Sequence, residues 1–314
     1  MYLDFFGLRE KPFALTPNTA FLVRLAPYQA CLNLLRVALG EGEGFVKVTG
    51  EVGTGKTLLC RALLNALGEE SDHWQLAWLP NPGLTPSGLR RALAQELHLT
   101  DIERLDHHGL LAALNRRLIE LAGQGKRTVL LIDEAQALPL ETLEAVRLLT
   151  NLETERCKLL QVVLFGQPEL DTLLERPDLR QLRQRITFSY RLQPLDAADT
   201  RRYVEERLGH AGHLGASLFD ERALRRLAAA SGGIPRLISI LAHKALMAAY
   251  GAGSRRVRAG HVQRALRDTE GARPFLQGGF LSLGWSLASA GGLLGLVLLW
   301  PWLQDWLGRG GLLP

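Results

Sequence analysis

The residues best suited to chemistry lie in one short run, Gly50-Glu51-Val52-Gly53-Thr54-Gly55-Lys56-Thr57, which fits the pattern G-x-x-x-x-G-K-[ST]. Its glycines let the backbone turn so that successive N–H groups point inward at phosphate oxygens. Such a cradle is neutral, so Lys56 would bring charge to the β- and γ-phosphates and the Thr57 hydroxyl would ligate Mg²⁺. The pattern predicts a site for ATP and Mg²⁺ that extends to Leu58.

The flanking sequence supplies the elements that must position this loop. Residues 45–49 are mostly β-branched or aromatic, as in a buried strand, and residues 58–64 continue at helical spacing. A glycine-rich turn with a chance lysine is the alternative. Strand, loop and helix in this order favour the phosphate-binding loop.

Two carboxylates follow a second buried run. Residues 129–132 are continuously apolar, and Asp133 and Glu134 come at their carboxyl end, where open α/β sheets bind ligands. Asp133 is placed to hold Mg²⁺, and Glu134 is the better candidate to polarise the water that attacks the γ-phosphate. A pair of solvated strand-end acids is the alternative, which the phosphate-binding loop upstream disfavours.

Two further polar residues could complete the site. Gln167 follows an apolar run at residues 159–165, so it would either contact the γ-phosphate or the attacking water, or only cap the next helix. Pro235 begins a predicted helix after two glycines, which sets Arg236 near the amino end of that helix. An arginine fixed there can swing over nucleotide phosphates when a small lid closes.

Three arginines precede the last predicted strand, at residues 187–192. An arginine can reach the γ-phosphate of a neighbouring subunit and stabilise the charge of the transition state. Most arginines on a helix are only solvated, so we expect one functional residue among the three: Arg180, Arg183 and Arg185.

The order of the elements predicts an α/β fold followed by a helical unit. Strands are expected at residues 45–49, 75–79, 128–132, 159–165 and 187–192, with helices at 27–39, 86–98, 108–122 and 139–154 between them. This alternation predicts a parallel sheet with helices on both faces. Beyond Pro194 the apolar periodicity is helical throughout, at 197–209, 220–230, 235–250 and 259–267.

Four phenylalanines lie in the turn-rich first 26 residues: Phe5, Phe6, Phe13 and Phe21. We expect them to pack on the main domain, and a ligand pocket there is the less favoured alternative. The predicted domains are an N-terminal aromatic segment with its flanking helix at 1–40, an α/β ATPase domain at 41–194 and a helical lid at 195–270.

These motifs together resemble the AAA+ ATPases. The opening run Tyr2–Leu8, with the runs 132–136 and 164–170, is similar to the ExeA/GspA-type secretion ATPases over roughly residues 1–270. The resemblance implies a P-loop fold with a five-stranded parallel sheet, in which Asp133 and Glu134 form the Walker B pair. It also implies that Arg236 is the sensor of the lid, and Arg185 is our choice for the arginine that acts in trans.

One departure from the AAA+ pattern affects the fourth strand. The polar residue that ends this strand is often Asn or Thr in that family, whereas this chain has Gly166-Gln167. The residue that senses the γ-phosphate from this strand therefore stays open.

An uncharged stretch from Pro274 to Gln304 contains an apolar run at 280–303, which is longer than the roughly 20 residues that cross a bilayer. It predicts a transmembrane helix, with a linker at 271–279 and a short tail at 304–314. More basic residues precede the run than follow it, so the ATPase domain should face the cytoplasm from a single-pass anchor in a bacterial inner membrane. A long buried soluble helix is the alternative.

Composition and charge exclude some classes of protein and leave several kinds of binding partner open. The three cysteines, Cys31, Cys60 and Cys157, have no C-x-x-C spacing, so neither structural zinc nor a disulfide framework is expected. The N-terminus lacks the features of a secretory signal. A net charge of +5 admits nucleic acid, an anionic membrane or a nucleotide, and does not choose among them.

We therefore expect a membrane-tethered, homo-oligomeric ATPase that supports assembly of a type IV (MSHA-like) pilus or type II secretion apparatus, with inner-membrane assembly proteins as partners. A nucleotide-dependent DNA-binding regulator of the transposition or replication-initiator type is the alternative. No DNA-reading module follows the lid, so nucleic acid is not the expected partner. A nucleotide-gated scaffold with negligible turnover also stays open. About ten residues follow the apolar run, so we expect no peptidoglycan-binding domain such as the ExeA type carries there.

Overall fold

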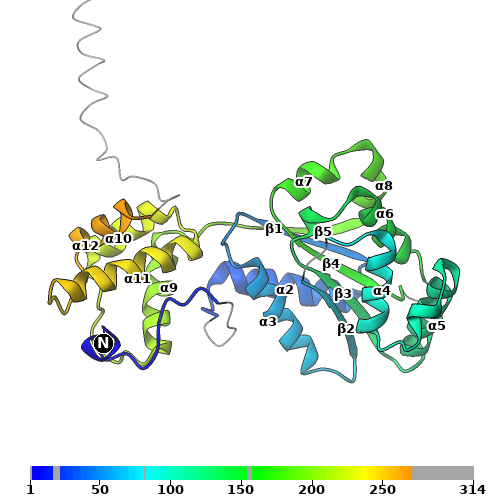
Figure 1. Ribbon diagram of the computed structural model, residues 1–314, viewed down its shortest axis with the longest axis horizontal. Helices are drawn as coiled ribbons and strands as arrows, with labels where there is room; N and C mark the ends of the chain where they lie inside the picture. The colour runs from blue at the N-terminus through cyan, green and yellow to red at the C-terminus, as the bar shows by residue number, and fades with distance from the viewer. Residues whose placement is uncertain (1, 17–21, 81–82, 154–157, 270–314) are drawn as a thin grey trace, which may run out of the picture. The chain divides into compact units, whose positions relative to one another are not determined.

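A five-stranded parallel sheet is the centre of the structure. The computed structural model describes residues 2–16, 22–80, 83–153 and 158–269. The sheet has the strand order β2-β3-β4-β1-β5 (Figure 1), which confirms the predicted parallel arrangement. Its strands are β1 (Phe45–Gly50), β2 (Trp74–Leu79), β3 (Arg127–Ile132), β4 (Gln161–Gly166) and β5 (Ile186–Leu192).

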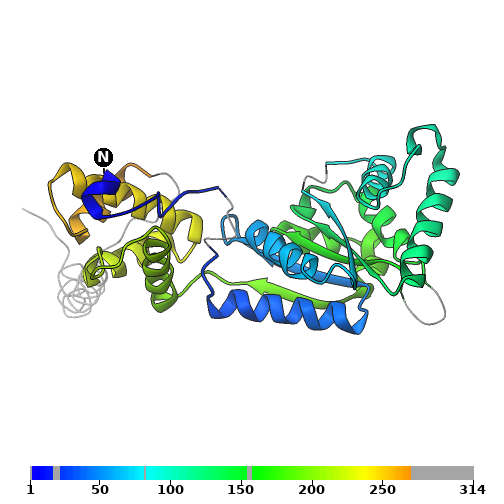
Figure 2. The same ribbon diagram turned by 90° about the horizontal axis from the view of Figure 1, so that it is seen from below.

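Helices cover both faces of this sheet because alternate strand residues enter different cores. Val46 and Val48 of β1 join the core that also holds residues of α2 (Ala26–Glu41) and α3 (Lys56–Gly68). Figure 2 shows these two helices on the same side of the sheet. Phe45 joins the opposite core. The helices of that second face are α4 (Pro86–Glu96), α5 (His107–Gly123), α6 (Leu140–Leu149), α7 (Glu169–Leu174) and α8 (Arg180–Arg185), with single 3₁₀ turns at Ile102–Arg104, Ala135–Ala137 and Pro177–Leu179.

Beyond β5 the described chain is helical. The elements are α9 (Ala197–His210), α10 (Glu221–Ser231), α11 (Pro235–Gly251) and α12 (Ala259–Arg267). Asp196 and Asp220 cap α9 and α10 by accepting the N–H groups of Asp199 and Ala223. The four predicted helices of the lid are thus present, within a residue or so of their expected ends.

The N-terminal aromatics pack on this helical lid. Phe5, in the short helix α1 (Tyr2–Phe6), lies edge-on to Tyr250 of α11, and Phe13 lies edge-on to Phe219 just before α10. Our expectation that they pack on the main domain is therefore wrong for these two residues, and Phe21 lies outside the described residues. The N-terminal residues thus cover apolar surface that the amphipathic helices of the lid would otherwise expose.

No helix in the described part of the chain is long and apolar enough to cross a membrane. The predicted transmembrane helix at 280–303 lies outside the described residues, and so do the linker and the tail.

Gly233 shapes the joint between β5 and the lid. Its φ is +75°, and a Cβ at this position would lie 2.0 Å from the carbonyl oxygen of Leu195. The N–H of Leu195 donates to the Gly233 oxygen at 2.8 Å, so the two backbones must approach this closely. Only glycine fits.

We expect Gly233→Ala to destabilise the chain markedly, because the added methyl collides with backbone as well as straining φ. Gly253→Ala is the matched control, since its φ is +65° and its Cβ would meet nothing within 4 Å. The control should cost about 1–2 kcal/mol from the left-handed φ alone. Thermal unfolding of both variants measures the difference, and equal midpoints would show that the joint has room.

Candidate nucleotide site

The glycine-rich loop connects β1 to α3 in a conformation that needs glycine. Gly53 and Gly55 have φ of +82° and +99°, in the left-handed region. Gly55 is the N-cap of α3, and no side chain caps that end of the helix. The free N–H groups of the first turn and the positive end of the helix dipole therefore remain available to an anion.

Lys56 is buried behind this loop, with 5% of its surface exposed. Its Nζ donates to the carbonyl oxygens of Gly50 at 2.8 Å and Glu51 at 3.0 Å. Burial lowers the pKa of Lys56, and the nearby carboxylates of Glu134 and Asp133 oppose that shift. The ammonium is thus held at the loop by acceptors on its own chain.

Asp133 lies beside the hydroxyl of Thr57. Its carboxylate is buried, accepts the N–H of Glu134 at 2.9 Å and hydrogen-bonds the Thr57 side chain. Burial raises the pKa of Asp133, and these two hydrogen bonds oppose the shift. A hydroxyl and a carboxylate placed together offer the oxygen ligands that Mg²⁺ prefers, so the residues present fit the ion.

Glu134 is held in an unusual backbone conformation with φ of +51°. Its Oε2 accepts hydrogen bonds from the amides of Gln136 at 2.6 Å and Gln167 at 3.0 Å. Burial alone would raise the pKa of Glu134, but the two amides and the charge of Lys56 outweigh it, and the pKa is lowered. Strain at a non-glycine residue is typical of functional positions.

Gln167 orients Glu134 in the structure and does not cap a helix. The N-cap of α7 is Pro168, and no side chain caps that helix. The backbone N–H of Gln167 also donates to the Gln136 side-chain oxygen at 2.9 Å. Sequence reasoning missed Gln136, because a glutamine two residues after a strand-end glutamate forms no pattern that would single it out.

Arg236 of α11 lies against the loop. Its backbone N–H donates to the Gly53 oxygen at 3.1 Å, and a Cβ on Gly53 would come within 2.6 Å of the Arg236 Cβ. Position 53 therefore requires glycine for two reasons, its left-handed φ and the close approach of Arg236.

A cavity of about 320 Å³ lies where these elements meet, within the range of small-molecule sites. Lys56, Thr57 and Glu134 line it from the α/β part, together with Val52, Gly53, Gly55 and Leu58. The lid contributes Tyr203, Arg207 and Arg236, and the N-terminal segment contributes Leu22, Val23 and Tyr28. Gly50, Glu51 and Thr54 instead support the loop, since the Thr54 hydroxyl donates to the Glu51 oxygen at 2.8 Å.

The N-terminal segment is therefore part of the site, which sequence reasoning did not favour. The Tyr28 hydroxyl donates to the Thr54 oxygen at 3.0 Å, so α2 is tied to the glycine loop. Arg207 of α9 donates to the carbonyl oxygens of Pro12 at 2.6 Å and Ala14 at 2.9 Å. These contacts hold the segment between the lid and the cavity.

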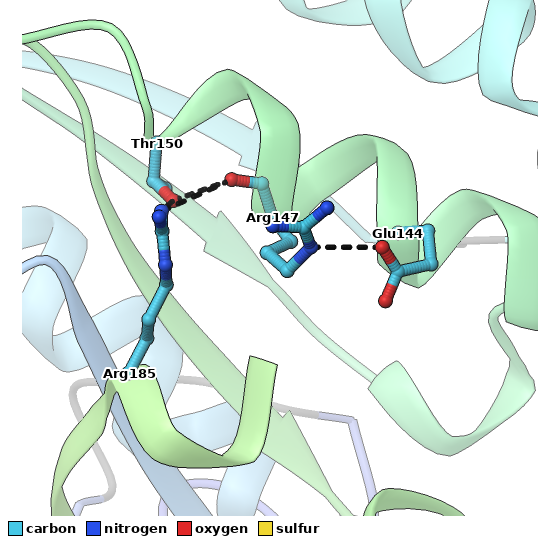
Figure 3. Close-up of polar contacts among 4 residues, drawn as sticks. All are labelled: Glu144, Arg147, Thr150 and Arg185. Carbon is cyan, nitrogen blue, oxygen red and sulfur yellow. Dashed lines mark hydrogen bonds and ion pairs between the residues drawn. The ribbon is translucent and has the colours of Figure 1, made fainter. Parts of the chain in front are cut away.

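Arg185 is not among the residues that line this cavity. Figure 3 shows its guanidinium at the last turn of α6, where Nη1 donates to the Thr150 hydroxyl at 3.3 Å and the Arg147 oxygen at 3.5 Å. The Arg147 side chain turns back to Glu144 at 2.8 Å, and the Arg147 carbonyl oxygen accepts from Thr150 and Arg185. Arg180 and Arg183 are exposed.

The fold and the loop define a P-loop chain with an AAA domain, and residues 39–174 match the family model described as AAA domain. The chain is related to General secretion pathway protein A of Aeromonas hydrophila, with 42% identity over 302 residues. The match covers 96% of this chain but only 54% of that protein, so this chain spans about half the length of its relative.

Solved structures confirm the fold. Cdc6p from Pyrobaculum aerophilum superimposes with a TM-score of 0.63 at 19% identity, over 82% of this chain and 70% of that one. Drosophila ORC bound to DNA gives a TM-score of 0.64 at 22% identity, over 85% of this chain and 65% of that one. At these identities the likeness concerns the fold alone.

Proposed function

We propose that this chain is a membrane-tethered ATPase that binds and hydrolyses ATP with Mg²⁺ to support assembly of a type II secretion or type IV pilus apparatus. The observation that carries the catalytic part is the convergence of a buried lysine, two strand-end carboxylates and a lid arginine on one glycine loop. In its ionised form each side chain has the charge that its proposed role requires.

The roles follow from the contacts. The loop N–H groups and Lys56 would hold the β- and γ-phosphates. Thr57 and Asp133 would hold Mg²⁺, which supplies positive charge to the phosphates when bound. Glu134, kept ionised by its two amide donors, would accept the proton of the attacking water, while Gln136 and Gln167 fix its orientation. Arg236 would add positive charge from the lid.

The proposed role in a secretion or pilus apparatus is supported by the relative and by the sequence. The name of the Aeromonas relative points to secretion, and the motif combination also resembles the pilus-biogenesis ATPase MshM. The predicted span at 280–303 supports a single-pass anchor in a bacterial inner membrane with a cytoplasmic ATPase domain. Inner-membrane assembly proteins and further copies of this chain are the proposed partners. Cells that lack the chain should lose pili or secreted proteins, and Lys56→Ala should not restore them.

The nucleotide site is tested by Lys56→Ala. Removing the buried ammonium leaves a neutral cradle, so ATP affinity should fall roughly 100-fold or more, since hydrogen bonds to charged groups each contribute about 1.5–3 kcal/mol. Titration with a fluorescent ATP analogue measures this, and a thermal melt shows whether the fold is retained. Lys126→Ala, just before β3, is the control and should bind normally. Wild-type affinity in Lys56→Ala would overturn the assignment of the loop.

A further inference from the structure

Arginines are frequent near the end of the lid, and the first acidic residue after them is Asp268. Between Gly251 and Arg267 the sequence contains five arginines and neither aspartate nor glutamate. All five are exposed. We call four of them the α12 basic surface: Arg256, Arg258, Arg264 and Arg267. Arg255 is left out because it donates to the Phe5 carbonyl and lies over the Phe5 ring at 4.2 Å.

The packing of α12 directs this surface outward. Val262, Ala265 and Leu266 are the buried residues of α12 and belong to the lid core with α10 and α11. Arg264 and Arg267 therefore lie on the other side of the helix, three residues apart and so adjacent. The bridge between Val257 and Phe219 sets the preceding loop beside the start of α10. Arg256 there shares a shallow groove with Arg222 and with the carboxylates of Asp220 and Glu221.

Asp220 and Glu221 lie near this surface but form no ion pair with it within the described part of the chain. No ion pair involves any of its four arginines there, whereas the nearby Glu221 pairs with Arg201. Asp220 accepts the N–H of Ala223 as the cap of α10. His261, between Arg258 and Arg264, has its pKa lowered by burial and then by these two arginines. Asp220 opposes this shift in the pKa of His261 and so partly offsets the two arginines.

The place of the surface in the chain favours a membrane over nucleic acid. Helix α12 ends at Arg267, and the uncharged run of the sequence begins at 274. Twelve residues, 268–279, separate the helix from the predicted span, and they reach at most roughly 40 Å when fully extended. Phosphate oxygens of lipid headgroups would therefore be within reach at high local concentration. Basic clusters beside a span bind anionic leaflets in this way.

We propose that the α12 basic surface docks on the anionic headgroups of the membrane and holds the lid against the bilayer. The proposal rests on the membrane tether of the proposed function and not on ATP hydrolysis. Each basic residue near an anionic surface contributes roughly a five-fold gain in partitioning, so four contribute several hundred-fold. Because α12 packs on α11, and Arg236 at the start of α11 contacts the glycine loop, docking holds the element that contacts the nucleotide site.

The test is arginine footprinting of the full chain in vesicles. Phenylglyoxal modifies accessible arginines, and mass spectrometry reads each site in vesicles of phosphatidylcholine alone and with about one third phosphatidylglycerol. We expect at least five-fold slower modification of the four arginines in the anionic vesicles only. Arg104 and Arg116, which are exposed on the α/β part, should react equally in both. Equal rates at the four arginines would overturn the proposal.

Two further arms separate the alternatives. Duplex DNA added to the neutral vesicles should give no protection at low micromolar concentration; protection by DNA, without any from phosphatidylglycerol, would assign the surface to nucleic acid and overturn the proposal. A variant with all four arginines changed to Gln should still float with phosphatidylcholine vesicles through its span. If the wild-type chain floats only with anionic vesicles, the tether of the proposed function fails while the basic surface stands.

Discussion

Glu134→Gln should bind ATP as the wild-type chain does and hydrolyse it roughly 10²–10⁴-fold more slowly, the range that a positioned general base contributes. The substitution keeps the shape of the side chain and removes its ability to accept a proton. Because the pKa of Glu134 lies below its ordinary value, the carboxylate is ionised throughout the neutral range. Phosphate release measured beside fluorescent-nucleotide binding separates the two effects.

Glu175→Gln is the control for this experiment, since it removes an exposed carboxylate at the end of α7. It should turn over normally. Unchanged turnover in Glu134→Gln would show that another group activates the water. Gln167 could not take over as a base, because a carboxamide does not accept a proton at neutral pH.

Removal of the exposed arginines of α8 should abolish hydrolysis and leave ATP binding and thermal stability intact. Arg180 and Arg183 are exposed and could meet a neighbouring subunit, whereas the guanidinium of Arg185 hydrogen-bonds the last turn of its own α6. An arginine supplied in trans raises turnover by roughly 10³–10⁵ in nucleotide hydrolases. Specific activity of the full chain in detergent should therefore rise with protein concentration.

Mixing tests the trans arrangement. Arg180→Ala/Arg183→Ala subunits and Lys56→Ala subunits, each inactive alone, should regain activity together, because a mixed interface pairs an intact loop with an intact arginine. Arg185→Ala should instead lower the unfolding free energy by about 1 kcal/mol through loss of its hydrogen bonds to α6. If Arg185→Ala keeps its stability, loses turnover and complements Lys56→Ala, the trans role belongs to Arg185. Concentration-independent turnover with no complementation would indicate a monomeric switch.

The elements of the fold could be predicted because their patterns are local. The buried strands, the glycine loop and the lid helices can each be recognised from a pattern of about ten residues. Helix α6 shows where this fails: we predicted it over residues 139–154, and it ends at Leu149. The Thr150 hydroxyl donates to the Arg147 oxygen at 2.8 Å, and Arg185 joins that turn from 35 residues away. The spacing of apolar residues carries no information about such a long-range hydrogen bond.

The same limit applies to the site, where residues in local motifs could be predicted and residues brought together by tertiary contacts could not. Lys56, Asp133 and Glu134 follow from motifs, and the structure places them around one loop. The amide pair around Glu134 depends on β3 and β4 lying side by side, which brings Gln167 to a residue 33 positions earlier. The N-terminal wall of the cavity depends on contacts of still greater separation, such as Arg207 with Pro12. Pairings of that kind are set by tertiary structure alone.

The packing of the first residues on the lid has a consequence during synthesis. Phe5 and Arg255 are in contact across a separation of 250 residues. A ribosome that adds roughly 5–20 residues per second needs roughly 12–50 s to cover that distance. For that time Phe5 has no lid to pack against. The lid core can therefore close only after almost all of residues 2–267 have been synthesised.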